Sequence, residues 1–163
     1  MQHVRQGNLI AIQHDGEYHY FLVLTESAFF GCQWSYCFYK TSNGLLAEDE
    51  ILKTYGNGFP ALVDFIIERR ANEVVKISKK VDVSSFQITS NLKARIDQYG
   101  GGHKWYIYSP GFSKIAQQGR LKPEQECLPI ASGLKAKDAI RLIKTKWKIE
   151  NVVTEEGRGQ YPL

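Results

Sequence analysis

Hydrophobic and β-prone residues in the first 40 positions predict three antiparallel strands. Two such runs, residues 9–14 and 17–24, flank the dipeptide Asp15-Gly16. An Asp-Gly pair between β-prone runs predicts a hairpin, because both turn residues must tolerate positive φ. A two-residue turn also sets the register, with these pairs: His14 with Glu17, Ile12 with His19 and Ile10 with Phe21. The tip of this hairpin is polar and its base apolar, so we expect the base to be rooted in a core.

A third run, residues 33–40, alternates strictly and places Trp34, Tyr36 and Phe38 on one face. Three strands with one aromatic face are enough for a stable nucleus, whereas an isolated hairpin is marginal in water.

The middle of the chain gives shorter elements. Residues 45–52 predict one or two helical turns with acidic residues first, which suits the helix dipole. Residues 61–67 fit either a helix that begins after Pro60 or a buried strand, and we favour the strand. Residues 73–83 predict either an exposed strand or an irregular edge, and their lysines discourage edge-to-edge association.

The second half mixes both kinds of element. Within residues 90–99, apolar positions at spacings of four and three predict a short amphipathic helix that ends at Gly100-Gly101-Gly102. Residues 103–109 predict a strand and residues 114–116 a short one. The strongest helical pattern covers residues 134–147, with its apolar positions on one face. A last strand over residues 149–153 and a tail over 154–163 complete the prediction.

Together these elements predict an α+β fold: a curved antiparallel sheet with the Asp-Gly hairpin at its N-terminal end, packed by a C-terminal helix. We expect a single domain over residues 1–163, strand-rich in 1–110 and helix-containing in 111–153. The chain is 43% hydrophobic and 12% aromatic, which suffices for a true core.

Charge and hydropathy narrow the choice of partners. The net charge of +4 is below the density of dedicated nucleic-acid binders, so nucleic acid is not the expected partner. No stretch approaches the roughly 18 apolar residues of a membrane span, and the N-terminus lacks a signal-peptide pattern. We therefore expect a cytoplasmic protein that does not associate with membranes.

The histidines and cysteines do not form a recognisable metal-binding or catalytic pattern. His14 and His19 lie on the two hairpin arms, but no third metal ligand follows at a known spacing, and His3 and His103 belong to other regions. Cys32 and Cys37 are too far apart in one extended run to form a disulfide, so they and Cys127 are expected to be free, mostly buried thiols. We expect no metal, no cofactor and no enzymatic activity.

Charged clusters are the remaining candidates. Glu48-Asp49-Glu50 and Glu155-Glu156 are the acidic ones. The first is either a solvated helix start or a docking patch for a basic partner, and we take Glu48, Asp49 and Glu50 as candidate partner-binding residues. The densest basic stretch consists of Lys135, Lys137, Lys144, Lys146 and Lys148, which fits a solvated helix face.

The opening of the chain resembles the immunity protein 26 family of bacterial polymorphic toxin systems. The resemblance lies in residues 6–12, in the turn and strand of residues 15–24, and in the closing strand 104–108 and helix 132–147. The chain departs from the family at Gln13, where proline is frequent, and at His19-Tyr20-Phe21, where small residues are usual.

This resemblance implies a cytoplasmic α+β protein without enzymatic activity. Such a protein binds and neutralises the C-terminal domain of a cognate toxin, as in contact-dependent inhibition. The family pattern assigns no inhibitory residue to a position in this chain.

A function of another class stays open. Aromatic and basic residues alternate in residues 104–108. A small nucleic-acid-binding module would use Trp105, Tyr106 and the lysines after Leu134, provided that the rings are exposed beside positive charge.

Overall fold

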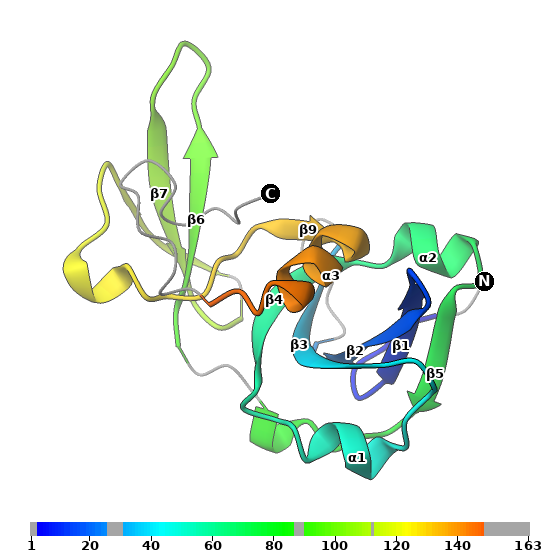
Figure 1. Ribbon diagram of the computed structural model, residues 1–163. Helices are drawn as coiled ribbons and strands as arrows, with labels where there is room; N and C mark the ends of the chain where they lie inside the picture. The colour runs from blue at the N-terminus through cyan, green and yellow to red at the C-terminus, as the bar shows by residue number, and fades with distance from the viewer. Residues whose placement is uncertain (1–2, 26–30, 87–89, 112, 149–163) are drawn as a thin grey trace. The chain divides into compact units, whose positions relative to one another are not determined.

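The computed structural model describes residues 3–25, 31–86, 90–111 and 113–148, which fold into two compact units (Figure 1). Unit 1 contains the described residues of 1–87 together with 133–147, and unit 2 contains those of 88–132 and Lys148. The fold is α+β, as expected: strands form two sheets and the C-terminal helix packs on the larger one.

The N-terminal hairpin consists of β1 (Leu9–His14) and β2 (Glu17–Val23). All three pairs expected from the sequence are present in its register. Asp15 and Gly16 adopt φ of 53° and 83°, the left-handed conformation that a two-residue hairpin turn requires. The hairpin prediction is therefore confirmed.

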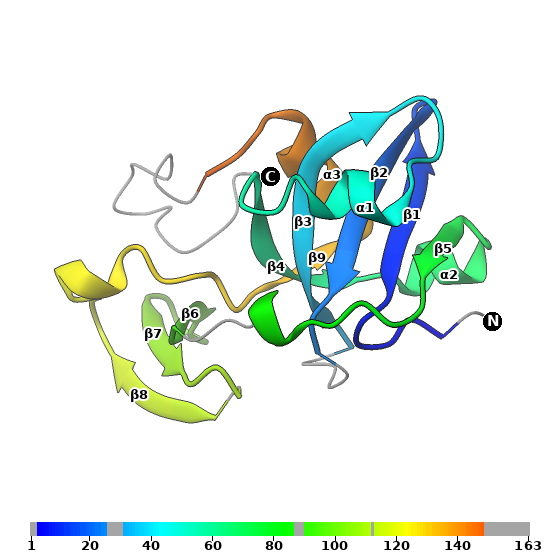
Figure 2. The same ribbon diagram turned by 90° about the horizontal axis from the view of Figure 1, so that it is seen from below.

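Six strands of unit 1 form a curved sheet that does not close, in the order β5-β1-β2-β3-β4-β9. The added strands are β3 (Gln33–Ser42), β4 (Gly58–Asp64), β5 (Val74–Ser78) and β9 (Gly133–Lys135). All neighbours pair antiparallel except β4 and β9, which pair parallel. Figure 2 shows β1, β2 and β3 side by side with a strong twist. The first four residues of β1 are all buried, so both faces of the sheet are covered there.

Residues 61–67, which fitted either a strand or a helix, contain the end of a strand and the start of a helix. Strand β4 runs to Asp64, and helix α2 (Ile66–Arg70) follows directly. The Asp64 carboxylate accepts a hydrogen bond from the backbone N–H of Ile66 at 2.8 Å, which turns the chain from strand to helix. The preferred strand is thus confirmed up to Asp64. The expected helix at 45–52 is also present, shortened to α1 (Glu48–Leu52).

Helix α3 (Ala136–Lys144) packs on β3, β4 and β9. Its buried residues form one face: Ala136, Ala139, Ile140, Leu142 and Ile143. The helix begins two residues later than the apolar pattern indicated, because residues 133–135 pair with β4 as strand β9.

Unit 2 contains a three-stranded antiparallel sheet, with β7 (His103–Tyr108) between β6 (Leu92–Asp97) and β8 (Lys114–Gln118). The helix expected over residues 90–99 was wrong: this segment is β6. Gly100, Gly101 and Gly102 all have positive φ and form a turn that returns the chain as β7. Pairing with β7 therefore overrides the local helical spacing.

Two short 3-10 turns, η1 (Ser84–Phe86) in unit 1 and η2 (Pro123–Gln125) in unit 2, complete the described elements. The strand expected at 149–153, the tail 154–163 and Glu155-Glu156 lie outside the described residues.

Candidate functional site

Helix α1 presents the three carboxylates selected from the sequence to solvent. Asp49 and Glu50 are exposed and Glu48 is half-exposed. The Glu50 carboxylate accepts the backbone N–H of Ala47 at 3.0 Å and so caps the helix, while Asp49 pairs with Lys53 at 3.4 Å. The exposed ion pair adds little stability. Glu48 makes no hydrogen bond or ion pair with another described residue, so its charge is available to a partner.

Two large apolar side chains flank α1 in the chain and are exposed. Leu45 is 49% exposed and Tyr55 is 46% exposed. The Tyr55 ring is held by ring contacts with Tyr36 and Phe86, at centroid distances of 4.7 and 4.4 Å.

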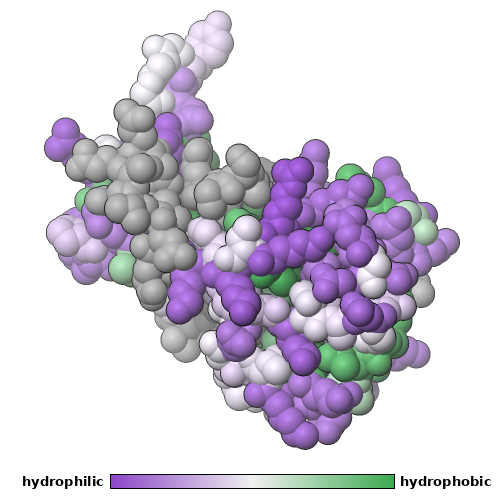
Figure 3. All heavy atoms as spheres, viewed as in Figure 1, coloured by the Kyte–Doolittle hydropathy of each residue, from purple (hydrophilic) through white to green (hydrophobic). Residues whose placement is uncertain are grey.

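We call this set the α1 patch; its members are Leu45, Glu48, Asp49, Glu50 and Tyr55. Figure 3 shows hydrophilic side chains gathered over the region where α1 lies in Figure 1. Helix α1 is anchored to the rest of unit 1, because its Ile51 is fully buried.

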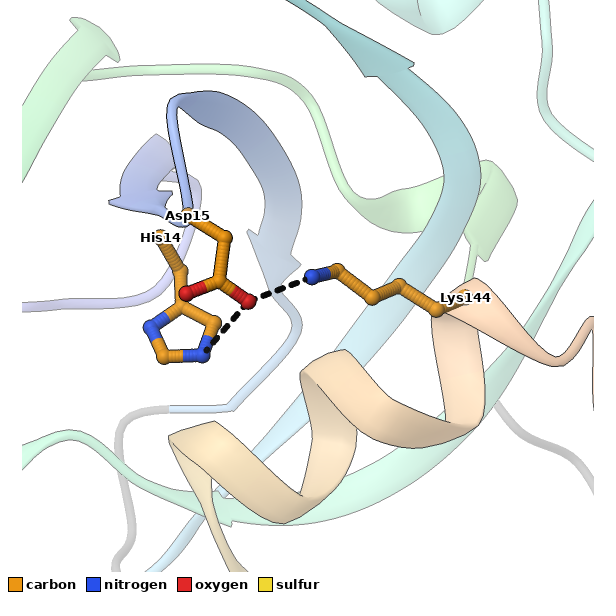
Figure 4. A network of polar contacts seen from close by, with 3 residues as sticks. All are labelled: His14, Asp15 and Lys144. Atoms are coloured by element: carbon orange, nitrogen blue, oxygen red, sulfur yellow. Dashed lines mark hydrogen bonds and ion pairs between the residues drawn. The ribbon is translucent and has the colours of Figure 1, made fainter.

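A second polar cluster ties the tip of the hairpin to α3 (Figure 4). The Lys144 ammonium donates a hydrogen bond to the Asp15 carboxylate at 2.8 Å, and the same oxygen lies 3.5 Å from His14 Nε2. These contacts lower the pKa of Asp15, the hydrogen bond from Lys144 contributing most. The network joins the hairpin tip to the end of α3, and as an exposed ion pair it adds little stability.

His19 of β2 lies near His14 and is fully buried. Its ring centroid is 6.5 Å from that of His14, and neither of its ring nitrogens makes a hydrogen bond of normal geometry to a described residue. Burial lowers the pKa of His19, partly opposed by the nearby backbone of His14. The imidazole is therefore held in its neutral form at neutral pH.

The two hairpin histidines do not extend into a metal site. Within the described ranges, no group of three or more His, Cys, Asp or Glu side chains is arranged to hold a metal ion.

Glu68 of α2 is a buried acid that sequence reasoning missed. It is 2% exposed, and its Oε2 has no hydrogen-bond partner among the described residues. Burial raises its pKa, and the neighbouring acids Glu73 and Asp64 raise it further. No signal in the sequence pattern distinguishes this glutamate from a solvated one, since its burial depends on the turn after β4.

The three cysteines form no disulfide, as expected: Cys32 and Cys37 are buried, and Cys127 is exposed. Burial raises the pKa of Cys32 and that of Cys37. Both buried thiols are thus disfavoured as thiolates, the form that acts as a nucleophile.

The aromatic residues of β7 point to opposite faces of the unit 2 sheet. Trp105 is only 4% exposed, so it cannot serve as a stacking surface, whereas Tyr106 is half-buried on the other face. The lysines expected on a solvated helix face are indeed exposed: Lys135, Lys137, Lys144, Lys146 and Lys148.

No helix in the described part of the chain is long and apolar enough to cross a membrane. Comparison with protein-family models, with curated proteins and with solved structures finds no match for this chain.

Proposed function

We propose that this chain is an immunity protein that binds the C-terminal domain of a cognate bacterial toxin and neutralises it by stoichiometric binding. The observation that carries the proposal is the α1 patch, in which exposed carboxylates lie on a rigid element flanked by exposed Leu45 and Tyr55. The resemblance of the hairpin and the closing helix to the immunity protein 26 family indicates the class of partner.

The composition of the α1 patch suits tight protein binding. Interface energy concentrates in a few anchors, tyrosine prominent among them, surrounded by residues that exclude water. Tyr55 is already ordered by its contacts with Tyr36 and Phe86, so it loses little conformational freedom when a partner covers it.

The negative charge of the α1 patch indicates which kind of toxin domain could bind there. A domain that acts on nucleic acid needs a basic surface to bind phosphates. The carboxylates of Glu48 and Asp49 complement such a surface and speed encounter, although the chain as a whole has a net charge of +4. The expected partner is therefore a toxin domain with a basic active face.

A growth assay tests the proposal. The toxic domain encoded by the gene immediately upstream is expressed with and without this chain in a sensitive host. We expect the wild-type chain to restore growth, and the double variant Glu48→Lys/Asp49→Lys to restore it less or not at all. Glu50 is left unchanged because it caps α1.

The matched control is Glu73→Lys/Glu124→Lys, which makes the same change in net charge at two exposed positions outside the patch. This control is expected to protect as well as the wild type. Failure of the wild-type chain to protect contradicts the immunity function, while equal protection by both double variants contradicts the assignment to the α1 patch.

A further inference from the structure

We infer that the outer edge of β5 binds an extended, acidic segment of another protein, which adds to the sheet of unit 1 as a further strand. The segment would lie beside a cluster of positive charge that we call the β5 cluster, made of Arg5, Arg69, Lys76 and Lys79. This surface differs from the α1 patch in place and in the sign of its charge, and the inference does not depend on the immunity function.

Strand β5 is an open edge of the larger sheet. It stands at one end of the strand order and pairs with β1 alone. In the part of the chain that the structure describes, no backbone group of residues 74–78 makes a hydrogen bond outside this ladder. Residues 75–78 are each half-buried, and Figure 2 shows β5 at the margin of the sheet beside β1. The outer N–H and C=O groups of β5 are therefore available to a further strand.

The N-terminal segment passes the end of β5 and does not pair along it. The Gly7 carbonyl accepts the backbone N–H of Val81 at 2.8 Å, and the Asn8 side chain donates to the Lys79 carbonyl at 3.1 Å. Both contacts are made with residues that follow β5 in the chain. They bring the N-terminal segment close to the edge while the backbone of β5 keeps its outer groups.

Four cationic side chains gather at this edge. The Asn8 side chain also accepts the backbone N–H of Arg5 at 3.0 Å, so it holds Arg5 next to Lys79. Arg5 and Lys79 are both exposed. The pKa of Lys76 is lowered, first by burial and then by the positive charges of Lys79, Arg5 and Arg69. The four charges are thus close enough to repel one another.

The β5 cluster is not neutralised by nearby carboxylates. None of the ion pairs between described residues includes Arg5, Lys76 or Lys79. Residues 66–80 contain five lysines and arginines but two glutamates, of which Glu68 is buried and Glu73 is exposed just before β5. Positive charge therefore remains for a partner to complement.

This charge selects the kind of strand that can be added. A second copy of the chain is disfavoured, because pairing two β5 edges would bring two basic clusters together. Side chains of an added strand alternate between the two faces of the sheet. Acidic residues at every second position would face Lys76, and the apolar residues between them would lie beside Val75 and Ile77 on the other face. The expected partner is a segment in which acidic and apolar residues alternate.

Fluorescence anisotropy of the full chain with a labelled peptide of alternating glutamate and valine tests the inference. We expect saturable binding that weakens as salt increases, and much weaker binding of the same peptide with glutamine in place of glutamate. Methylation of the backbone nitrogens of the peptide keeps every charge but removes the hydrogen-bond donors. It should weaken binding by about tenfold or more. Hydrogen exchange of residues 74–78 should slow when the unmethylated peptide is bound.

The double variant Arg5→Glu/Lys79→Glu reverses two exposed charges of the cluster and should weaken binding by about tenfold or more. Its matched control is Lys40→Glu/Lys135→Glu, which makes the same change in net charge at two exposed positions of unit 1 outside the cluster. The control should bind the peptide like the wild type. Circular dichroism of each variant confirms that it is folded.

Three results overturn the inference. The first is the absence of peptide binding by the wild type at low salt, including the case in which the chain binds oligothymidylate or anionic vesicles instead. The second is equal binding of the methylated and unmethylated peptides, because charge alone would then account for the contact. The third is a loss of affinity in Arg5→Glu/Lys79→Glu no greater than that in the control variant.

Discussion

At the scale of single residues, two buried titratable groups dominate the pH response that we expect from unit 1. His19 and Glu68 each have ring or carboxylate atoms without a hydrogen-bond partner among the described residues. Burial disfavours the charged form of both, so it lowers the pKa of His19 and raises that of Glu68. Because the two shifts have opposite signs, each group is best tested with its own variant.

For His19, the unfolded chain takes up a proton near the ordinary pKa of 6.5, while the folded chain resists protonation. The stability contributed by the neutral ring is therefore complete above pH 6.5 and is lost as pH falls toward the folded pKa. Each unit of lowered pKa corresponds to about 1.4 kcal/mol.

The measurement is urea unfolding of the wild type and of His19→Leu between about pH 8 and about pH 5. The surrounding charged groups, Asp15, His14, Glu17 and Lys144, are present in both proteins. We expect the wild type to lose stability relative to the variant as pH falls. A difference in the free energy of unfolding that does not change with pH contradicts the account.

For Glu68, the folded pKa is raised above 4.5, so the folded state holds its proton more firmly than the unfolded chain does. The associated stability is present below pH 4.5 and is lost as pH rises through the folded pKa. Replacement by glutamine keeps the size of the side chain and removes the ionisable group.

Glu68→Gln should therefore be more stable than the wild type at neutral pH, and the advantage should shrink as pH approaches 4.5. Thermal unfolding at several pH values measures this. Glu73→Gln, at an exposed neighbour, is the control and should change stability much less. A less stable Glu68→Gln protein at neutral pH would show that the carboxylate is favourably paired when charged.

At the scale of elements, local chemistry determined which parts of the fold were predictable. Asp15-Gly16 carries its turn conformation in its residue types, so the hairpin and its register follow from the sequence. The apolar positions of α3 repeat with helical spacing on one buried face, so that helix was predictable too.

Elements that depend on distant pairing were not predictable. The spacing of Leu92 and Ile96 favours a helix, but β6 is a strand because β7 pairs with it. Strand β9 is three residues long and exists through its parallel pairing with β4.

The same holds for the candidate sites. The acidic residues of α1 were visible in the sequence because three carboxylates follow one another there. The contact of Asp15 with Lys144 joins residues far apart in the chain, and the burial of His19 and Glu68 depends on tertiary packing.

The pairing of β3 with β4 requires a glycine at position 58. A Cβ added to Gly58 would lie 2.2 Å from the carbonyl oxygen of Cys37 and 2.8 Å from the Tyr36 ring. The oxygen belongs to the backbone of a paired strand, so it cannot move without disturbing the sheet.

Gly58→Ala should therefore destabilise the protein by about 1–3 kcal/mol or more. Gly44→Ala is the matched control, because a Cβ there meets no atom within 4 Å, and its effect should stay within about 0.5 kcal/mol. Chemical denaturation of the two variants beside the wild type gives both values. If Gly58→Ala were as stable as the wild type, the backbones of β3 and β4 would not be as close at Gly58 as the structure shows.

At the scale of the whole molecule, the two units present different chemistry to partners. Unit 1 combines a covered sheet with the acidic and aromatic α1 patch, and unit 2 is a three-stranded sheet that has buried residues on both faces. An acidic surface suits a basic protein. Substitutions in the α1 patch should therefore weaken toxin binding, whereas substitutions at exposed positions of unit 2 should leave it unchanged.

Calorimetric titration of the purified chain with the C-terminal domain of the protein encoded immediately upstream tests the central proposal most directly. It predicts saturable binding at one chain per toxin domain and loss of toxin activity at the same ratio. Glu48→Lys/Asp49→Lys should bind more weakly, and Glu73→Lys/Glu124→Lys should bind like the wild type. Absence of binding, or binding at one-to-one that leaves the toxin fully active, would contradict the assignment of this chain as an immunity protein.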